Sequence, residues 1–449
     1  MIEKLAKYIA GARRRALPAA VVEKTKHHVL DTIAAMVSGS RLLPGRKAIS
    51  YAKTRGGTKE ACVVASGFLT TAENAALANG MLAHADETDD SHAPSLTHPG
   101  CGIVPAALAV SERERSSGEA LLRAVALGYD VGCRLTMSLN AYEFREDGHS
   151  THSFGPMFGA AAAAGCLLGF NEKQTRYLLS YTAQQASGIS CWMRDEEHIE
   201  KAFDFGGMPA RNGVAAAAMV GHGFTGVEDA FSGERSFFVA YGRDPKPGKL
   251  VEGLGETYEI MNTNIKRWSV GSPIQAPLDA LALLLKENQI EIANIEKVVV
   301  RVAHQGANTT NNRDMPDICM QHLCAVMVLD GTVSFKTSHD EKRMKDPKVL
   351  ALRKKIELLG DDALTRVMPS RQGIVEVFLR GERKLRHHMT AVRGTAENPM
   401  TRAEVDAKSY DLVAPVLGRD RGRKLCDAIW NLDRLKDVRS LRHLLKEKQ

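Results

Sequence analysis

The densest group of ionisable residues lies between His84 and Gly100. This segment contains four carboxylates, three histidines and several hydroxyl groups within seventeen residues. An imidazole has an ordinary pKa of roughly 6.5, so it can donate or accept a proton near neutral pH, and a neighbouring carboxylate can orient it. The composition of the segment therefore indicates general acid–base chemistry.

Two apolar helices must hold this segment at its ends. Alanines at helical spacing after Thr70-Thr71-Ala72-Glu73, which fits a capping box, predict a helix that ends near Ala85. Pro94 and Pro99 delay the next helix, which is predicted from about Gly102 to Glu114. We expect a polar loop that presents its acids and bases in a cleft. The alternative is a solvated surface loop that caps the second helix.

Other chemistries fit the segment less well. His92 and His98 are six residues apart with Pro94 between them, and neither zinc-site nor EF-hand spacing is present. Ser91 lacks a G-x-S-x-G setting, which excludes the usual hydrolase nucleophile. His84 has a structural alternative, because an imidazolium is favourable at a helix C-terminus. Since no G-x-G-x-x-G follows a predicted strand and no phosphate-binding loop is evident, we expect neither a metal nor a cofactor.

The positioning elements are predicted to form a mainly α protein. Residues 1–266 indicate a large all-helical domain, completed by residues 396–449. The Ala-rich tracts Gly159 to Gly169 and Gly213 to Gly221 predict buried helices at its centre, because small side chains let backbones approach closely.

A smaller α+β lid domain is predicted over residues 267–395. Ile295 to Val302 is rich in β-branched residues, and Gly373 to Leu379 is followed by a hairpin turn signal. Helices are predicted over Leu278 to Glu287 and Pro347 to Leu359.

Composition narrows the class of function. The net charge is +7 but is spread thinly, which argues against a nucleic-acid partner and is compatible with a small anionic substrate. Eight cysteines without paired spacing indicate free thiols in a cytoplasmic protein. The longest near-apolar stretch, Phe158 to Gly169, is too short for a bilayer, which takes about 20 residues. His27-His28 and His387-His388 are predicted to lie on solvated faces.

The loop and the following Cys101-Gly102-Ile103-Val104-Pro105 resemble the signature of the MmgE/PrpD family, in which the pattern is H-A-x-D-F-D-D-T-H and then H-P-G. That family includes 2-methylcitrate dehydratase, cis-aconitate decarboxylase and iminodisuccinate epimerase. The resemblance implies a homodimer with a helical domain, a lid and a site in the cleft between them.

The resemblance also implies catalytic positions. A Glu replaces the family's first Asp, a Ser replaces its Thr, and one of two histidines occupies the next site position. An Asp also stands at position 204, where the family often has a histidine. The catalytic residues implied are Glu87, Asp90, Ser91, His98, His149 or His152, and Lys201.

Substrate contacts are expected from six further residues. Gln275 and His322 stand where the family often has histidine and tyrosine, which changes the proton transfers available. The substrate-binding residues expected are Arg211, Lys266, Arg267, Gln275, His322 and His92.

The resemblance implies a metal-independent, cofactor-free lyase that acts on a small di- or tricarboxylate. We expect His98 to act as the base or acid, oriented by Glu87 or Asp90, and Lys201 to neutralise a substrate carboxylate. Dehydration of a 2-methylcitrate-like hydroxy acid is the reaction expected first. Decarboxylation of an unsaturated tricarboxylate, epimerisation, and a carboxylate-binding protein without activity are the alternatives.

Overall fold

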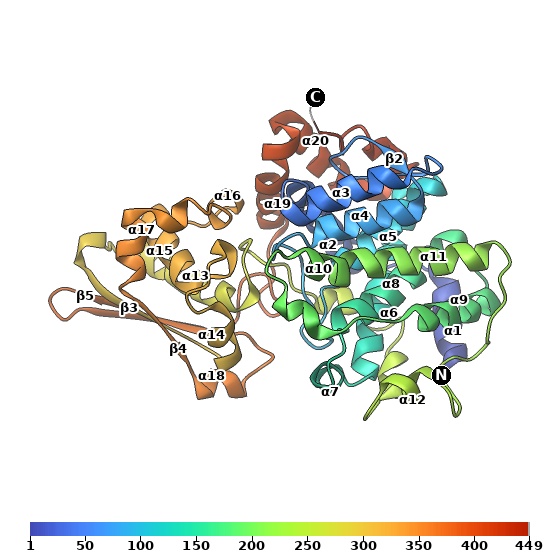
Figure 1. Cartoon of the computed structure of the whole chain (residues 1–449), viewed down its shortest axis with the longest axis horizontal. Coiled ribbons are helices and arrows are strands. Elements are labelled where there is room, and N and C mark those ends of the chain that lie inside the picture. Colours follow the sequence, from blue (N-terminus) through green and yellow to red (C-terminus); the bar gives the residue numbers. More distant parts are fainter. Residues whose placement is uncertain (448–449) are drawn as a thin grey trace. The chain divides into compact units, whose positions relative to one another are not determined.

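The computed structural model describes residues 1–447, which form two compact units. The first unit combines residues 1–263 with the C-terminal segment that begins at Arg402, and the second comprises residues 264–401. Helices predominate, so the protein is mainly α, as predicted (Figure 1). Within the described residues, the longest apolar helices fall short of what a bilayer crossing requires.

The first unit is built almost entirely from helices. Its two short strands, β1 (Ala61–Cys62) and β2 (Leu69–Thr70), pair antiparallel. Its helices are α1 (Ile2–Gly11), α2 (Ala19–Gly39), α3 (Leu43–Arg55), α4 (Ala72–Ala83), α5 (Pro99–Arg113), α6 (Gly118–Ser138), α7 (Ala141–Glu146), α8 (Thr151–Leu168), α9 (Glu172–Gln185), α10 (Ile199–Ala202), α11 (Met208–Gly221), α12 (Phe237–Tyr241), α19 (Arg402–Leu417) and α20 (Arg419–Trp430).

The Ala-rich helix α8 lies at the centre of this unit. It packs against α5, α6 and α11, which surround it in Figure 1. Its residues from Thr151 to Leu167 are buried on every side, as the small side chains predict. The C-terminal helix α19 lies against α2, although nearly 400 residues of chain separate their starting points.

The two helices that hold the polar loop begin and end close to the predicted positions. Helix α4 is capped by Thr71, whose hydroxyl accepts from the Asn74 N–H, so the predicted capping box is one residue too early. Helix α5 begins at Pro99, three residues before the predicted start. Proline suits that first position because its missing N–H would have no helical partner there.

The second unit contains a four-stranded sheet in the order β4-β3-β5-β6. Strand β3 (Ile295–Val302) is parallel to β4 (Ile356–Gly360) and antiparallel to β5 (Gly373–Leu379), which forms the predicted hairpin with β6 (Lys384–Met389). Its helices are α13 (Gln275–Glu287), α14 (His304–Thr310), α15 (Met320–Asp330), α16 (Phe335–Ser338), α17 (Pro347–Arg353) and α18 (Asp362–Arg366).

One predicted helix of this unit is wrong in its second half. The helix that begins at Pro347 ends at Arg353, and residues from Ile356 form edge strand β4. The sheet supplies the reason, because pairing with β3 satisfies the backbone of this segment and Ile356 packs into the core with Val298 and Val300.

A close backbone crossing positions the segment that follows α10. Phe203–Gly207 forms one turn of π-helix, labelled η3, which packs against α4. A Cβ atom on Gly80 would lie 2.3 Å from the Gly206 carbonyl oxygen, and one on Gly206 would lie 2.1 Å from the Gly80 carbonyl oxygen. Only glycine permits this approach.

Gly80→Ala is expected to lower the free energy of unfolding by about 1–3 kcal/mol, because the added methyl group forces the two backbones apart. Urea denaturation followed by circular dichroism measures the change. Gly248→Ala is the control, since a Cβ atom there meets nothing within 4 Å. Equal stability of the two variants would contradict the crossing described.

Candidate active site

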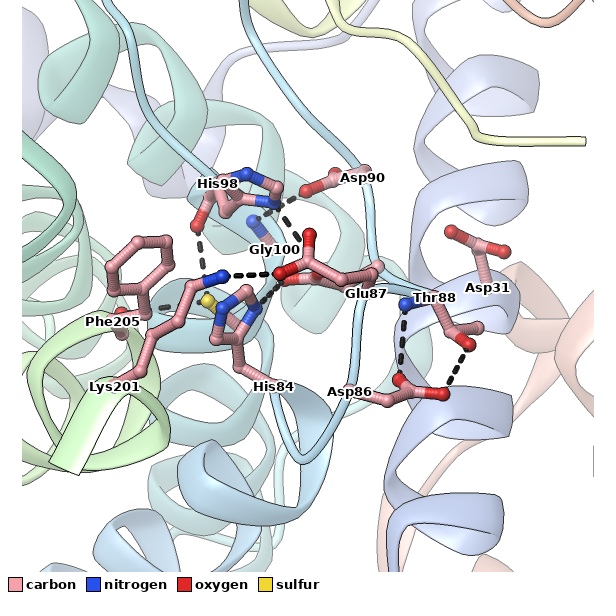
Figure 2. A network of polar contacts seen from close by, with 12 residues as sticks. Asp31, His84, Asp86, Glu87, Thr88, Asp90, His98, Gly100, Lys201 and Phe205 are labelled. Atoms are coloured by element: carbon pink, nitrogen blue, oxygen red, sulfur yellow. Dashed lines mark hydrogen bonds and ion pairs between the residues drawn. The ribbon is translucent and has the colours of Figure 1, made fainter. Parts of the chain in front are cut away.

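The polar loop between α4 and α5 is buried, not solvated. His84 follows the last residue of α4 and His98 immediately precedes α5, so one histidine stands at each end of the loop. Residues 84–90 are all buried. The alternative of a solvated surface loop is therefore wrong, and the ionisable side chains meet inside the protein (Figure 2).

The carboxylate of Asp89 joins the two histidines. The Nδ1 atom of His84 lies 2.9 Å from Asp89 Oδ2, and Nδ1 of His98 lies 3.2 Å from Asp89 Oδ1. A carboxylate accepts hydrogen bonds, so each Nδ1 carries the proton and donates. This arrangement leaves Nε2 of each ring as the atom that can exchange a proton.

Burial and the neighbouring imidazoles shift the pKa of Asp89 in opposite directions. Desolvation alone raises the pKa of the Asp89 carboxyl, but the two imidazoles and their hydrogen bonds outweigh it and hold that pKa well below its ordinary value. Burial lowers the pKa of His84. Asp89 is therefore the ionised partner at neutral pH. His98 retains about a tenth of its side-chain exposure and is the more accessible of the two imidazoles.

Asp90 has a different task from the one predicted. Its Oδ1 accepts from the Gly100 N–H (3.0 Å), and its Oδ2 accepts from the Tyr129 hydroxyl (2.5 Å) and from His28 Nδ1 (2.8 Å). These donors bind Asp90 to the start of α5 and to two neighbouring helices. Asp89, and not Asp90, makes the hydrogen bond to His98, so the prediction that Asp90 orients His98 is wrong.

His28 also corrects the prediction for the His27-His28 pair. Both rings are buried, and His28 is completely inaccessible. Burial lowers the pKa of His28 to about 4, although its hydrogen bond to Asp90 opposes that shift. The charged residues nearby in sequence suggested a solvated face, but the face that carries His28 packs against the loop.

Aromatic rings gather around Phe205, which lies in η3. Its ring stacks on His152 with centroids 3.8 Å apart and on His84 at 4.3 Å, while Trp192 meets it edge-on at 4.7 Å. The His98 and His152 centroids are 5.3 Å apart. These contacts form one cluster, which we call the Phe205 ring cluster and which consists of Phe205, His84, His98, His152 and Trp192.

The structure distinguishes the two histidines that the sequence left as alternatives. His152, in the first turn of α8, belongs to the Phe205 ring cluster. His149 precedes α8 and stacks instead on Phe144, 4.5 Å away, with Tyr241 at its edge. The structure therefore brings His152 to His98 and places His149 in a separate aromatic group.

Lys201 brings a positive charge to the cluster. Its ammonium group forms an ion pair with Glu87, and it lies 5.3 Å from the centroid of Phe205 and 5.6 Å from that of Trp192 (Figure 2). The Lys201 and Glu87 side chains are 17% and 10% exposed, so the pair is largely desolvated. Cation–π contacts further favour the ammonium at this position.

The C-terminal helix α19 binds the backbone of the loop through Lys408. Lys408, on α19, donates to the Thr88 carbonyl oxygen (3.0 Å) and to Asp31 Oδ1 on α2 (2.6 Å). Asp86 accepts from both the N–H and the hydroxyl of Thr88. Lys408 therefore fixes the loop between Glu87 and Asp89 to two helices.

Three further predicted site residues of this unit, His92, Ser91 and Arg211, also lie outside the Phe205 ring cluster. Buried His92 contacts the Ser95 hydroxyl at 2.7 Å and Glu259 at 3.3 Å. Ser91 is half-buried beside it. Arg211, on α11, donates to the Asn212 side chain and lies over the Phe203 ring.

The other predicted substrate contacts belong to the second unit. Gln275 donates to the carbonyl oxygens of Trp268 and Val270 and accepts from the Trp268 N–H, so its amide supports a backbone turn. Arg267 pairs with Asp279 at 3.2 Å. A substrate contact at Gln275 stays a prediction, although both N–H groups of its amide already donate to the backbone.

The two remaining predicted substrate contacts of that unit, Lys266 and His322, are buried. Lys266 is 4% exposed and His322 is inaccessible, with neither ring nitrogen hydrogen-bonded. Burial, together with the charges of Arg353 and Arg343, lowers the pKa of His322 to about 4.

Several site residues were not identified from the sequence. His198 lies with its ring centroid 5.2 Å from that of His84, and Asp89, Phe205, Trp192 and Lys408 have the roles described above. Asp89 was visible as part of the Asp-Asp pair. Lys408 carried no local signal, because its partners lie more than 300 residues away.

Asp204 connects two elements that build the ring cluster. It lies in η3 beside Phe205 and accepts a hydrogen bond from the hydroxyl of Ser150, the residue that precedes α8. Burial raises the pKa of Asp204 to about 7, and this hydrogen bond opposes the shift only in part. Asp204 therefore changes charge near neutral pH.

Comparison with known proteins identifies the family of the chain. The MmgE/PrpD N-terminal domain matches residues 3–249, and the MmgE/PrpD C-terminal domain matches residues 268–434. The chain therefore belongs to the MmgE/PrpD family, which supports a lyase-type activity at the level of the family.

Three similar proteins are named as cis-aconitate decarboxylases or as a protein like them. The cis-aconitate decarboxylase of Aspergillus terreus is 23% identical over 96% of this chain and 92% of its own length. That of Homo sapiens is 25% identical, with 99% and 94% covered. The cis-aconitate decarboxylase-like protein oryM of Aspergillus oryzae is 25% identical over 68% of this chain and 67% of its own length.

Asp204→Asn is expected to change how stability depends on pH. The folded pKa of about 7 exceeds the unfolded value of about 3.9, so the wild-type protein loses stability as pH rises between these values, by at most about 1.4 kcal/mol per pH unit. The Asn variant lacks this loss. Urea denaturation from pH 4.5 to 8 measures the difference.

The exposed Asp314→Asn is the matched control and should follow the wild-type curve. Parallel curves for wild type and Asp204→Asn would show that folding does not raise the pKa of Asp204.

Proposed function

We propose that the protein is a lyase that removes CO₂ from a small unsaturated tricarboxylate of the cis-aconitate type, with His98 as the proton donor to carbon. The observation that carries the proposal is the Asp89 bridge, which holds His98 beside His152 and close to the Lys201–Glu87 pair. The names of the relatives, at 23–25% identity, support the choice of reaction.

Lys201 would bind one carboxylate of the substrate. An incoming carboxylate competes with Glu87 for the ammonium group, in a setting that is already largely desolvated. A charge-assisted hydrogen bond of this kind contributes about 1.5–3 kcal/mol. The pairing of Lys201 with Glu87 keeps the ammonium in place before the substrate arrives.

His98 would supply the proton. When the bond to the departing carboxylate breaks, its electron pair is delocalised through the adjacent carbon–carbon double bond onto the carboxylate at the far end of that bond, as an enediolate-like charge. Transfer of a proton from His98 Nε2 to one end of this allylic system completes the replacement of CO₂ by hydrogen. Asp89 stabilises the protonated imidazole before the transfer, because its carboxylate accepts from Nδ1 at 3.2 Å.

Dehydration of a 2-methylcitrate-like hydroxy acid is the second candidate. Elimination needs a base for the proton beside a carboxylate and an acid for the departing hydroxyl group. The neighbouring imidazoles of His98 and His152 favour this candidate, since their centroids are 5.3 Å apart. Burial holds the pKa of His152 well below its ordinary value, so this imidazole is neutral and suits the base.

Incubation in D₂O with cis-aconitate, 2-methylcitrate, citrate and aspartate-derived acids, followed by proton NMR, tests these candidates. Decarboxylation is expected to give a product with one deuterium at an end of the three-carbon allylic unit. Loss of water from 2-methylcitrate alone would support the second candidate. Exchange without net conversion would indicate epimerisation, and no change with any acid would contradict a lyase.

His98→Ala is expected to lower kcat by a factor of about 10²–10⁴, as for the loss of a general acid, while the fold remains intact. Turnover of the substrate found by NMR measures the effect, and circular dichroism with Tm reports the fold. His222→Ala is the control, because that histidine is exposed at the end of α11. Wild-type turnover in the His98 variant would remove His98 from the mechanism.

A further inference from the structure

Two buried imidazoles with unpartnered nitrogens lie beside the Glu87 carboxylate. A ring nitrogen of His84, a ring nitrogen of His198 and a carboxylate oxygen of Glu87 lie within 4.8 Å of one another. The Nε2 atoms of both histidines are buried without a hydrogen-bond partner. Unsatisfied buried nitrogens of this kind are uncommon and need an explanation.

The chemistry of the three side chains selects the type of ligand. Two neutral imidazoles and one carboxylate are donors that suit Zn²⁺ and similar transition metals, whereas Mg²⁺ and Ca²⁺ prefer oxygen ligands. Burial lowers the pKa of both histidines, so each ring is in the neutral form that binds a metal. His84 is also oriented through its other nitrogen by Asp89, as metal-binding histidines usually are.

The geometry needs a modest contraction. Zinc–nitrogen and zinc–oxygen distances of about 2.0–2.1 Å place tetrahedral ligands roughly 3.4 Å apart, so the three atoms, which lie within 4.8 Å of one another, must close by at most about 1.4 Å. The His198 ring stands at the start of the four-residue helix α10, and Glu87 lies on the loop. Short elements of this kind can shift more readily than the helices around them.

A second group, formed by His84, Asp89 and His98, has the same spacing. In that group both oxygens of Asp89 already accept hydrogen bonds from the two imidazoles. Metal binding there would have to displace these two bonds. In the group with His198, the Nε2 atoms of both histidines have no hydrogen-bond partner to displace, so it is the better site.

We propose that His84, His198 and Glu87 form a binding site for Zn²⁺, in which the metal takes Glu87 from Lys201. The ammonium group of Lys201 already forms an ion pair with the Glu87 carboxylate, so Zn²⁺ and the ammonium compete for that carboxylate. The site is independent of the reaction catalysed, because it rests only on these donors.

Isothermal titration calorimetry of the EDTA-treated full chain with ZnCl₂ tests the proposal, together with the visible absorption of Co²⁺ as a report of tetrahedral coordination. One equivalent of Zn²⁺ is expected to bind with a Kd tighter than about 10 μM, and Mg²⁺ is expected not to bind. His198→Ala should weaken Zn²⁺ binding by at least roughly 10²-fold, since it removes a ligand.

Lys201→Ala is expected to change the affinity for Zn²⁺ in the opposite direction from His198→Ala. Removal of the competing ammonium should tighten Zn²⁺ binding by about 10-fold, whereas a merely structural role for Lys201 would weaken it. His222→Ala is the control for an exposed histidine and should match wild type. The Tm of each metal-free variant shows whether it folds.

Absence of stoichiometric binding to wild type, or unchanged affinity in a folded His198→Ala variant, would overturn the proposal. If His98→Ala abolishes binding and His198→Ala does not, the second group is the site and the proposal is wrong. Calorimetry needs no substrate, so failure of the proposed reaction would leave these outcomes interpretable.

Discussion

The site depends on one buried negative charge. Asp89 has no exposed surface, and a lone carboxylate there would carry a heavy desolvation cost. The imidazoles of His84 and His98 offset this cost through two hydrogen bonds, and in return the carboxylate fixes the tautomer and direction of both rings. Removal of either histidine would leave a charge without its partner, so the three residues form a single unit.

The surrounding structure holds this unit from several distant parts of the chain. Asp90 binds the loop to the start of α5 and to α2 and α6, while Lys408 fixes its backbone from α19. The glycine crossing of α4 and η3 brings Phe205 against His84. These contacts on several sides hold the polar loop between α4 and α5 in one conformation.

Much of this arrangement could be predicted from the sequence. The composition of residues 84–98, the prolines and the flanking apolar helices identify a polar loop with His98 at its end. The alternation of β5 and its turn predict the hairpin. These features depend on local chemistry and spacing, which a single sequence records.

The remaining features depend on tertiary contacts. Adjacent Asp89 and Asp90 look equivalent in sequence, but only the fold determines that one contacts imidazoles and the other contacts α5. The burial of His28, the choice of His152 over His149 and the strand at Ile356 follow in the same way from neighbours that are remote in sequence. Gln275 differs from these examples, because its partners are close in sequence. Its amide, which we assigned from the sequence to the substrate, donates to the backbone of a nearby turn.

The place of Lys408 in the chain has a consequence for biosynthesis. The second unit is inserted between Thr263 and Arg402, and the helix that anchors the loop is made only after that insertion. While the polypeptide is being translated, Asp31 and the Thr88 carbonyl must wait for a lysine that leaves the ribosome more than 300 residues later. The nascent protein therefore cannot assemble a fully supported reaction centre until its last helices emerge.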